Sequence, residues 1–384
     1  MDKHTISVHA GQRRGTNQGV VNPVDPSTAF HYIDQGEQFY PRYFNTPGQQ
    51  AIVEKLARLE HAETGLLFSS GMAAMSMTLL SHLRPGDHAV VLSGLYGGTH
   101  SFVIQEFADA GIEWTFFGGT AGELPDILQE RTRLILLETP TNPLLEIIDM
   151  QAIAEVARQQ GLTTVLDNTF ASPVNQNPLE HGIDLVVHSG TKYLGGHSDL
   201  SFGAVLGSES MVATVRRKAV NYGGNLNGMT CYLVERSLKT LALRVTRQNE
   251  TAGKIARFLE GHEAVQSVHY PGLATAPGHA VASRQMSGFG GMLSFELAGL
   301  LPAQELLESL QLITPAMSLG GVETTATLPV FTSHRKMPSA QRRQLGIGDR
   351  LVRLSVGIED ATDLIGDLHQ GLDRVSRLAA AESV

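Results

Sequence analysis

The sequence predicts an α/β protein with a mostly parallel sheet, helices on both faces of that sheet, and a smaller α+β domain at the carboxyl end. Two patterns predict this fold. Between about residues 65 and 190, short continuous apolar runs alternate with segments of helical period, which is typical of parallel strands buried on both faces. After about Tyr232, a long helical stretch precedes strands and helices in mixed order.

The pattern divides the 384 residues into three regions. Residues 1–45 form an arm rich in turn formers and aromatic residues, residues 46–232 form the α/β domain, and residues 233–384 form the α+β domain. An arm with so little helical period needs a surface to lie against. That surface is either the body of its own subunit or a neighbouring subunit.

The expected elements follow in order. A helix begins after Pro47-Gly48, because apolar residues recur at helical spacing from Gln49 to Leu59. The rest of the α/β domain has strands at 65–68, 88–93, 134–138, 163–167 and 183–188 and helices at 70–80, 99–110 and 150–160. The α+β domain has a helix at 235–259, strands at 291–296 and 351–355, and helices near 303–310 and 361–376.

Composition excludes several classes of function. The net charge of −9 and the absence of a lysine/arginine cluster argue against a nucleic-acid partner or an anionic membrane surface. Cys231 is the only cysteine, so no intramolecular disulfide can form, and the 15 histidines are scattered without metal-ligand spacing. We therefore expect no metal. Without an apolar signal core or an 18-residue apolar run, we expect a cytoplasmic protein.

The most informative segment is His188-Ser-Gly-Thr-Lys-Tyr193, at the end of an apolar run. Lys192 sits where a strand would deliver it into a pocket, and a desolvated lysine can attack a carbonyl. Ser189 and Thr191 flank it with hydroxyls suited to a phosphate. Pyridoxal 5′-phosphate (PLP) suits all three side chains, because its aldehyde forms a Schiff base with the lysine and its phosphate binds the two hydroxyls. Taken alone, such a segment is more often a surface lysine beside a glycine turn.

Other side chains fall at the same expected sheet edge. Asp167 ends a strand and would suit the pyridinium nitrogen of PLP, although an aspartate there could also cap a helix. Ser70-Gly71-Met72 opens a helix whose amides form an anion site. Tyr96, on a strand-end loop, is either a stacking proton donor or a packed loop tyrosine.

Two residues of the last domain are candidates for substrate binding. Arg353 lies among the apolar residues of a strand. Its guanidinium is either solvated or binds a carboxylate through two parallel hydrogen bonds. Ser318 adds a hydroxyl in a glycine-rich turn. No G-x-G-x-x-G follows a strand, which argues against a nicotinamide dehydrogenase.

With these motifs, the chain resembles the cysteine/methionine-metabolism family of PLP enzymes, which includes cystathionine γ-synthase, cystathionine β- and γ-lyases and methionine γ-lyase. The resemblance covers almost the whole chain in order. Its further motifs are Tyr40-Pro-Arg42, Leu95-Tyr-Gly-Gly-Thr99, Glu138-Thr-Pro-Thr-Asn-Pro143, Gly196-His-Ser-Asp199, Leu238-Lys-Thr-Leu241, Ser318-Leu-Gly-Gly321 and Arg353-Leu-Ser-Val-Gly-Ile-Glu-Asp360.

The resemblance implies the PLP-dependent transferase fold of type I, which is like that of aspartate aminotransferase, and a role for each matching residue. Lys192 would carry the cofactor and shuttle protons, Asp167 would pair with the pyridinium, and Tyr96 would stack on the ring and act as an acid/base. Asn142, Arg353 and Ser318 would bind the substrate. The phosphate would be held by Gly71, Met72, Ser189 and Thr191, and by Tyr40 and Arg42 of a neighbouring subunit. That sharing of sites implies a homotetramer built from dimers.

Three departures from the family pattern bear on specificity. Met317 stands where cystathionine γ-synthases and γ-lyases typically carry a glutamate, Gly98 stands where methionine γ-lyase has its cysteine, and Asn227-Gly228 replaces the usual Ser-Pro. We therefore expect a lyase that eliminates a β- or γ-substituent, a thiol or an oxygen-linked group as in canavanine, from a cysteine- or homoserine-type amino acid. The alternative is γ-replacement on an O-acylhomoserine by a cystathionine γ-synthase or sulfhydrylase.

Overall fold

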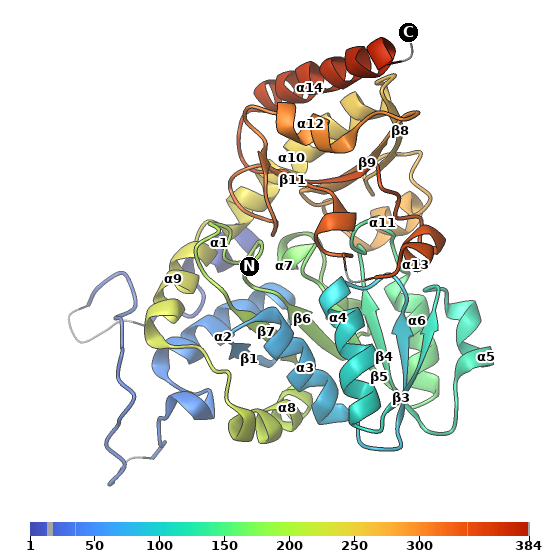
Figure 1. The fold of residues 1–384 in the computed structure, drawn as a ribbon. Helices are drawn as coiled ribbons and strands as arrows, with labels where there is room; N and C mark the ends of the chain where they lie inside the picture. Colours follow the sequence, from blue (N-terminus) through green and yellow to red (C-terminus); the bar gives the residue numbers. More distant parts are fainter. Residues whose placement is uncertain (14–17, 35, 336, 383–384) are drawn as a thin grey trace.

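The computed structural model describes residues 1–13, 18–34, 36–335 and 337–382. Two sheets organise it (Figure 1). The elements of the first part are α1 (Lys3–His9), η1 (Pro41–Tyr43), α2 (Pro47–Glu60), β1 (Thr64–Phe68), α3 (Gly71–His82), β2 (His88–Leu92), α4 (Gly97–Phe102), η2 (Val103–Phe107), β3 (Glu113–Phe117), η3 (Ala121–Glu123), α5 (Leu124–Ile127), β4 (Thr132–Glu138), α6 (Met150–Gln159), β5 (Thr163–Asp167), α7 (Ser172–Asn175), η4 (Pro178–His181), β6 (Leu185–His188), β7 (Gly203–Gly207), α8 (Glu209–Tyr222) and α9 (Gly228–Leu238).

The larger sheet has seven strands in the order β1-β7-β6-β5-β4-β2-β3. All neighbours pair in parallel except β7, which is antiparallel to both β1 and β6. The central strands are apolar throughout and buried on both faces, as in 134–137 of β4. Helix α3 packs on the sheet together with α8, and α2 contacts β1 and β7 from the other face (Figure 1). The mostly parallel sheet with helices on both faces is confirmed.

The second part forms a five-stranded sheet in the order β10-β11-β12-β9-β8, with helices packed on it (Figure 1). Its strands are antiparallel apart from the β10–β11 pair. Its elements are α10 (Leu241–Glu260), β8 (Val265–His269), α11 (His279–Gln285), β9 (Met292–Leu297), α12 (Ala303–Ser309), β10 (Thr314–Pro315), β11 (Thr325–Thr327), η5 (Pro329–Phe331), α13 (Ser339–Gln344), β12 (Leu351–Ser355) and α14 (Ala361–Glu382).

Two helical expectations were wrong in detail. The stretch 235–259 is two helices, since α9 ends at Leu238 and α10 starts at Leu241 after Thr240. The stretch 99–110 contains the π-helical turn η2, which widens the helix locally. The strands β3 and β7 and the helix α8 were not expected at all. The expected helix starts at 47 and 70 are confirmed, and Ser70 Oγ accepts the N–H of Ala73 at 3.1 Å as an N-cap.

The arm leaves the body of the subunit before α2 (Figure 1). Residues 18–34 and 36–40 form no helix or strand. Their apolar side chains at Val20, Tyr32 and Ile33 are exposed. In contrast, α1 is fixed to the body, because the buried Lys55 of α2 donates from Nζ to the carbonyls of Ser7 and Val8.

Candidate active site

A cavity of about 260 Å³ lies at the carboxyl ends of the central strands. Its walls come from the ends of β4 and β5, the turn after β6, the start of α3, and β12 with two loops of the second part. The predicted site residues that line it are Gly71, Met72, Tyr96, Asn142, Asp167, Ser189, Thr191, Lys192, Ser318 and Arg353. The fold therefore gathers side chains from both parts of the chain in one place, although their individual roles stay predictions.

Lys192 lies in a tight turn after β6, in which its N–H donates to Ser189 O at 3.1 Å. Its Nζ donates to Ser318 Oγ at 2.9 Å. Burial lowers the pKa of Lys192, and the charge of Arg353 lowers it further. A lysine in this environment is more readily available as the free amine, which is the form that attacks an aldehyde.

The loop that carries Ser318 packs tightly on the lysine turn. Ser318 adopts a left-handed φ of 77°, and Gly320 a φ of 74°. A Cβ atom on Gly320 would lie 2.7 Å from the backbone nitrogen of Tyr193. Only glycine allows this approach, so the glycine-rich turn is needed to bring the Ser318 hydroxyl to the lysine.

Asp167 ends β5 and faces the cavity. Its Oδ1 accepts the backbone N–H of Thr169 at 2.9 Å and also the Thr169 hydroxyl. Burial raises the pKa of Asp167, while these two donors act in the opposite direction. A buried carboxyl group of this kind suits a cationic partner, and a protonated pyridine nitrogen is one.

Glu138 is a site residue that sequence reasoning missed. It ends β4 and lines the same cavity. Its carboxyl oxygens accept the backbone N–H of Tyr96 at 2.9 Å and that of Asn142 at 3.0 Å. Burial raises the pKa of Glu138 well above its usual range, and the charge of Asp167 raises it further. The signal was present, because Glu138 is a carboxylate at the end of a buried strand, as Asp167 is.

The start of α3 and the turn after β6 form a narrow cradle. A Cβ atom on Gly71 would lie 2.6 Å from the Cβ of Ser189 and 2.7 Å from its Oγ. Gly71 and Met72, in the first turn of α3, line the cavity together with Ser189 and Thr191. Amides, hydroxyls and a helix N-terminus together make a site for a phosphate.

Arg353 of β12 is only 4% exposed and points into the cavity. Its guanidinium donates to Asn142 Oδ1 at 2.9 Å and to the carbonyl of Ser318 at 3.2 Å. Burial lowers the pKa of Arg353 to about 10. Its Nε is buried and has no hydrogen-bond partner. A buried guanidinium with an unused donor is suited to a carboxylate ligand.

Tyr96 follows β2 at the start of α4 and is 42% exposed, so its ring lies at the mouth of the cavity. A Cβ atom on Gly98 would lie 2.4 Å from Cε1 of the Tyr96 ring. A larger residue at 98 would therefore move this ring. Met317, which is 70% exposed, and the residues Thr332 and Ser333 complete the wall from the second part.

The third departure from the family pattern has a local explanation. Asn227 caps α9, since its Oδ1 accepts the N–H of Thr230 at 2.9 Å. A Cβ atom on Gly228 would lie 2.1 Å from the carbonyl oxygen of Asp25 in the arm. These two residues are thus required by the cap and by the close passage of the arm.

Arg42 lies on η1 and Tyr40 directly precedes it, and neither residue lines the cavity of its own subunit. Arg42 donates to the carbonyl of Val220 and lies 5.7 Å from the centroids of the Tyr40 and Tyr43 rings. Their expected contact with the phosphate of a neighbouring subunit stays a prediction.

The expectation that the protein binds no metal also stays a prediction. Among the described residues, one group has metal-ligating atoms within 4.8 Å of one another; it consists of His262, His369 and Asp373, none of which lines the cavity. His262 uses Nδ1 to accept the N–H of Ala264, at 3.2 Å. A histidine that ligates a metal through one ring nitrogen usually donates a hydrogen bond from the other nitrogen. Because Nδ1 of His262 accepts a hydrogen bond instead, these three residues are not arranged as a metal site.

Within the described residues, no helix combines the length and apolarity that a bilayer-spanning segment needs.

The cavity fits PLP on two independent grounds. The Gly71–Ser189 cradle offers phosphate ligands where a larger side chain would block them, and the buried Asp167 carboxyl needs a cationic partner. Lys192 lies in the same cavity, with a lowered pKa.

Comparison with known proteins agrees with this chemistry. The family model described as "Cys/Met metabolism PLP-dependent enzyme" matches residues 4–373. The chain is 39% identical over 379 residues to the cystathionine gamma-lyase of Dictyostelium discoideum, covering 96% of this chain and 97% of that protein. It is also 39% identical over 387 residues to the cystathionine beta-lyase of Bacillus subtilis, covering 98% and 99%. The crystal structure of cystathionine gamma synthase from Xanthomonas oryzae pv. oryzae in complex with cystathionine has a TM-score of 0.95 and 38% identity, with 98% of this chain and 99% of that chain covered.

Proposed function

Because this chain belongs to the family of Cys/Met metabolism PLP-dependent enzymes, we propose that it is a lyase that eliminates a β- or γ-substituent from a cysteine- or homoserine-type amino acid. The leaving group is a thiol or an oxygen-linked group as in canavanine. The observation that carries the proposal is the convergence of Lys192, Asp167 and Arg353 in one cavity. This chemistry needs an amine, a carboxyl group and a guanidinium group that binds the carboxylate of the amino acid.

PLP is the cofactor, and when bound it supplies an electron sink that stabilises negative charge at the Cα of the amino acid. Lys192 holds the aldehyde and moves protons at Cα and Cβ, which its lowered pKa favours. Asp167 would pair with the ring nitrogen, and Gly71, Met72, Ser189 and Thr191 would hold the phosphate.

Three further residues bind and orient the amino acid. Arg353 and Ser318 bind its α-carboxylate, and Asn142 contacts the carboxylate and the ring oxygen of PLP. Arg353 has a free buried Nε and already engages Asn142, which supports a shared carboxylate site. Tyr96, at the cavity mouth, would stack on the ring and would donate a proton to the departing group.

A second candidate function is γ-replacement on an O-acylhomoserine. It is supported by the likeness to a cystathionine gamma synthase that was solved with cystathionine. In this reaction a thiol is captured where the lyase would add water. The wall formed by Met317 carries no charge for the distal amino group of cystathionine. This disfavours cystathionine as substrate or product, and so it supports a lyase that acts on another cysteine- or homoserine-type amino acid.

We also propose a homotetramer of dimers with shared sites, in which Tyr40 and Arg42 reach the phosphate of the partner subunit. The exposed apolar residues Val20, Tyr32 and Ile33 of the arm support a covering partner. A cytoplasmic location, expected from the sequence, remains part of this proposal.

Product analysis by mass spectrometry tests the reaction. The PLP-loaded protein is given, separately, L-cystathionine, L-methionine, L-homocysteine, L-canavanine, and O-succinyl-L-homoserine with L-cysteine. Pyruvate from cystathionine shows β-elimination and 2-oxobutyrate shows γ-elimination, whereas homoserine from canavanine shows loss of an oxygen-linked group. Cystathionine formed in the last mixture, with no 2-oxo acid in the others, would favour the synthase.

The substitution Lys192→Ala tests the site itself. It should abolish turnover together with the absorbance of the lysine-linked cofactor. Lys254→Ala, at an exposed position of α10, is the control and should retain both. Full activity of Lys192→Ala would refute the central assignment.

A further inference from the structure

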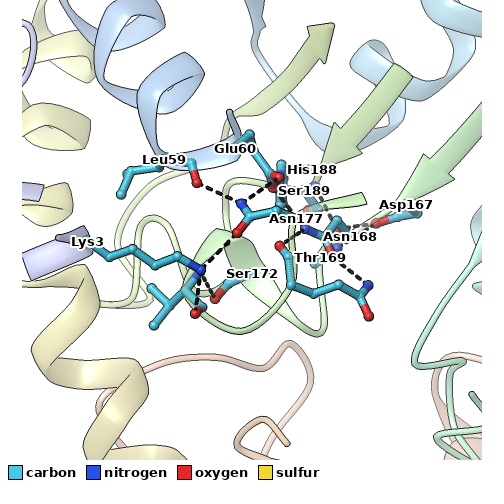
Figure 2. Close-up of polar contacts among 12 residues, drawn as sticks. Lys3, Leu59, Glu60, Asp167, Asn168, Thr169, Ser172, Asn177, His188 and Ser189 are labelled. Atoms are coloured by element: carbon cyan, nitrogen blue, oxygen red, sulfur yellow. Dashed lines mark hydrogen bonds and ion pairs between the residues drawn. The ribbon is translucent and has the colours of Figure 1, made fainter. Parts of the chain in front are cut away.

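A buried polar cluster lies directly behind the cavity, and the proposed mechanism does not use it. Its members Glu60, Asn168, Asn177 and His188 are almost fully buried (Figure 2). Asn168 follows Asp167, and His188 precedes Ser189. Because successive residues of a strand point to opposite faces, Asn168 and His188 point away from the cavity that Asp167 and Ser189 line.

Glu60, at the end of α2, is the centre of this cluster. Its side chain is 0% exposed and forms an ion pair with Nε2 of His188, which is 1% exposed. Asn168 Nδ2 donates to Glu60 Oε1 at 2.8 Å, and Asn177 Nδ2 lies 3.5 Å from Oε2 (Figure 2). Each contact to the carboxyl group is one in which it can accept, which is how an ionised carboxylate binds.

A fully buried carboxylate needs a positive partner. His188 supplies it at short range when its ring is protonated. The nearest further cation in the cluster is Lys3 of α1, whose Nζ donates to Asn177 Oδ1 at 2.9 Å and to the carbonyl of Val174 at 2.9 Å (Figure 2). The Glu60 carboxyl group is thus held next to the His188 ring, with the ammonium group of Lys3 one residue farther out.

The cluster is connected to the cavity through the backbone and through Thr169. The N–H of Asn168 donates to Val187 O at 2.9 Å, so β5 and β6 are fixed to each other one residue beyond Asp167. The N–H of Ser189 donates to Thr169 Oγ1 at 2.8 Å, and Thr169 in turn donates to Asp167. Burial raises the pKa of Asp167, and the charge of His188 acts against this.

We propose that Glu60 and His188 form a buried positioning pair that holds Asp167 ionised and aimed at the ring nitrogen of PLP, with Lys3 fastening the pair to α1. The inference rests on the proposed placement of Asp167 at that nitrogen. Neither residue of the pair lines the cavity, so both act through Asp167 and the neighbouring backbone.

Glu60→Gln and His188→Gln test the pair, since each removes one charge and keeps most of the volume. Each should raise the Kd for PLP about tenfold, as is typical for groups that orient a ligand from behind. Each should also lower the protonated fraction of the cofactor ring nitrogen in the holoenzyme. That fraction is read by nitrogen NMR of PLP labelled at the ring nitrogen, a signal that a merely structural role would leave unchanged.

Two further variants complete the design. Glu60→Asp keeps the charge and should restore most of the ring-nitrogen signal that Glu60→Gln loses. Glu54→Gln is the matched control, because Glu54 lies on the same helix and pairs with Arg58 at the surface. It should leave the Kd and the NMR signal unchanged.

If Glu60→Gln does not fold, His188→Gln and Lys3→Met carry the test, and Lys3→Met should raise the Kd for PLP about two- to fivefold because Lys3 is the outer member. Folded His188→Gln and Lys3→Met proteins with the parental Kd and ring-nitrogen signal would overturn the inference. These signals do not depend on turnover. A failure of the lyase proposal in product analysis would therefore leave the result readable.

Discussion

Glu138 and Asp167 are register partners at the ends of the neighbouring strands β4 and β5, and both carboxyl groups line the cavity. Burial raises the pKa of both, and their mutual repulsion adds to the shift at Glu138. Glu138 already accepts the backbone N–H groups of Tyr96 and Asn142, whereas both donors to Asp167 reach its Oδ1 alone. In the proposed function Asp167 serves the cofactor, while Glu138 holds the loops that carry Tyr96 and Asn142.

These two roles predict different outcomes for isosteric changes. Asp167→Asn should lower kcat/KM about a hundredfold or more, because it removes the charge that keeps the ring nitrogen protonated. Glu138→Gln should retain the protonated ring nitrogen but destabilise the protein by about 1–3 kcal/mol, because an amide NH2 would face a backbone N–H donor. Steady-state kinetics and urea unfolding of both variants check this. Equal losses of kcat/KM without loss of stability would contradict it.

A second prediction concerns the Gly71 cradle. Gly71→Ala places a Cβ atom 2.6 Å from that of Ser189, so it should cost about 1–3 kcal/mol of overpacking and raise the Kd for PLP at least about tenfold. The control is Gly366→Ala in α14, where no atom lies within 4 Å of an added Cβ. It should stabilise the protein by about 0.5–1 kcal/mol. Titration of the apoprotein with PLP and thermal unfolding distinguish the two.

A third prediction concerns Met317 and the preference of the enzyme for cystathionine over methionine. Met317→Glu adds a carboxylate to the cavity wall and should raise kcat/KM for cystathionine at least about tenfold relative to methionine, because a charge-assisted hydrogen bond contributes about 1.5–3 kcal/mol. Met317→Gln, of similar size without the charge, should change the ratio little. Competition assays with both amino acids measure it. The same ratio in all three proteins would show that Met317 does not contact the distal group.

The burial of His334 leads us to expect that the stability of the protein depends on pH. Burial lowers the pKa of His334 to about 4, and the nearby Arg353, His100 and Arg342 act in the same direction. The unfolded chain has a pKa of about 6.5, so it binds more protons than the folded protein between these values. The contribution of His334 to stability should therefore fall by about 3 kcal/mol as the pH drops from 6.5 to 4.

His334→Asn isolates this contribution. The free energy of unfolding of the variant, measured in urea at several pH values, should approach that of the parent as the pH falls. A difference that stays constant from pH 7 to pH 4 would show that His334 does not change its proton affinity on folding.

Sequence reasoning reached the fold class because the apolar runs of the central strands reflect burial on both faces. It missed β7 altogether, since the short apolar run of this strand lies between two glycines, which are typical of turns. It also missed the break at Thr240, where neither glycine nor proline marks the end of a helix. The arrangement of neighbouring chain segments decides both features.

For the site, residue type and strand ends were enough to find Lys192 and Asp167, and the same rule would have found Glu138. The pair of Glu60 and His188 could not be read in this way. The two residues lie 128 positions apart, and only the packing of α2 behind β6 brings them together.

Ser318 has a consequence for protein engineering. Its hydroxyl accepts the proton of Lys192 while its carbonyl accepts that of Arg353, so a single residue sets the spacing between the amine and the carboxylate fork. In a chimera that joins the first part of this chain to the second part of a relative, the distance between the Lys192 amine and the Arg353 guanidinium would change. Such recombinants should work only when the crossover keeps residues 317–321 with the turn at 189–196, and insertions in either segment should be poorly tolerated.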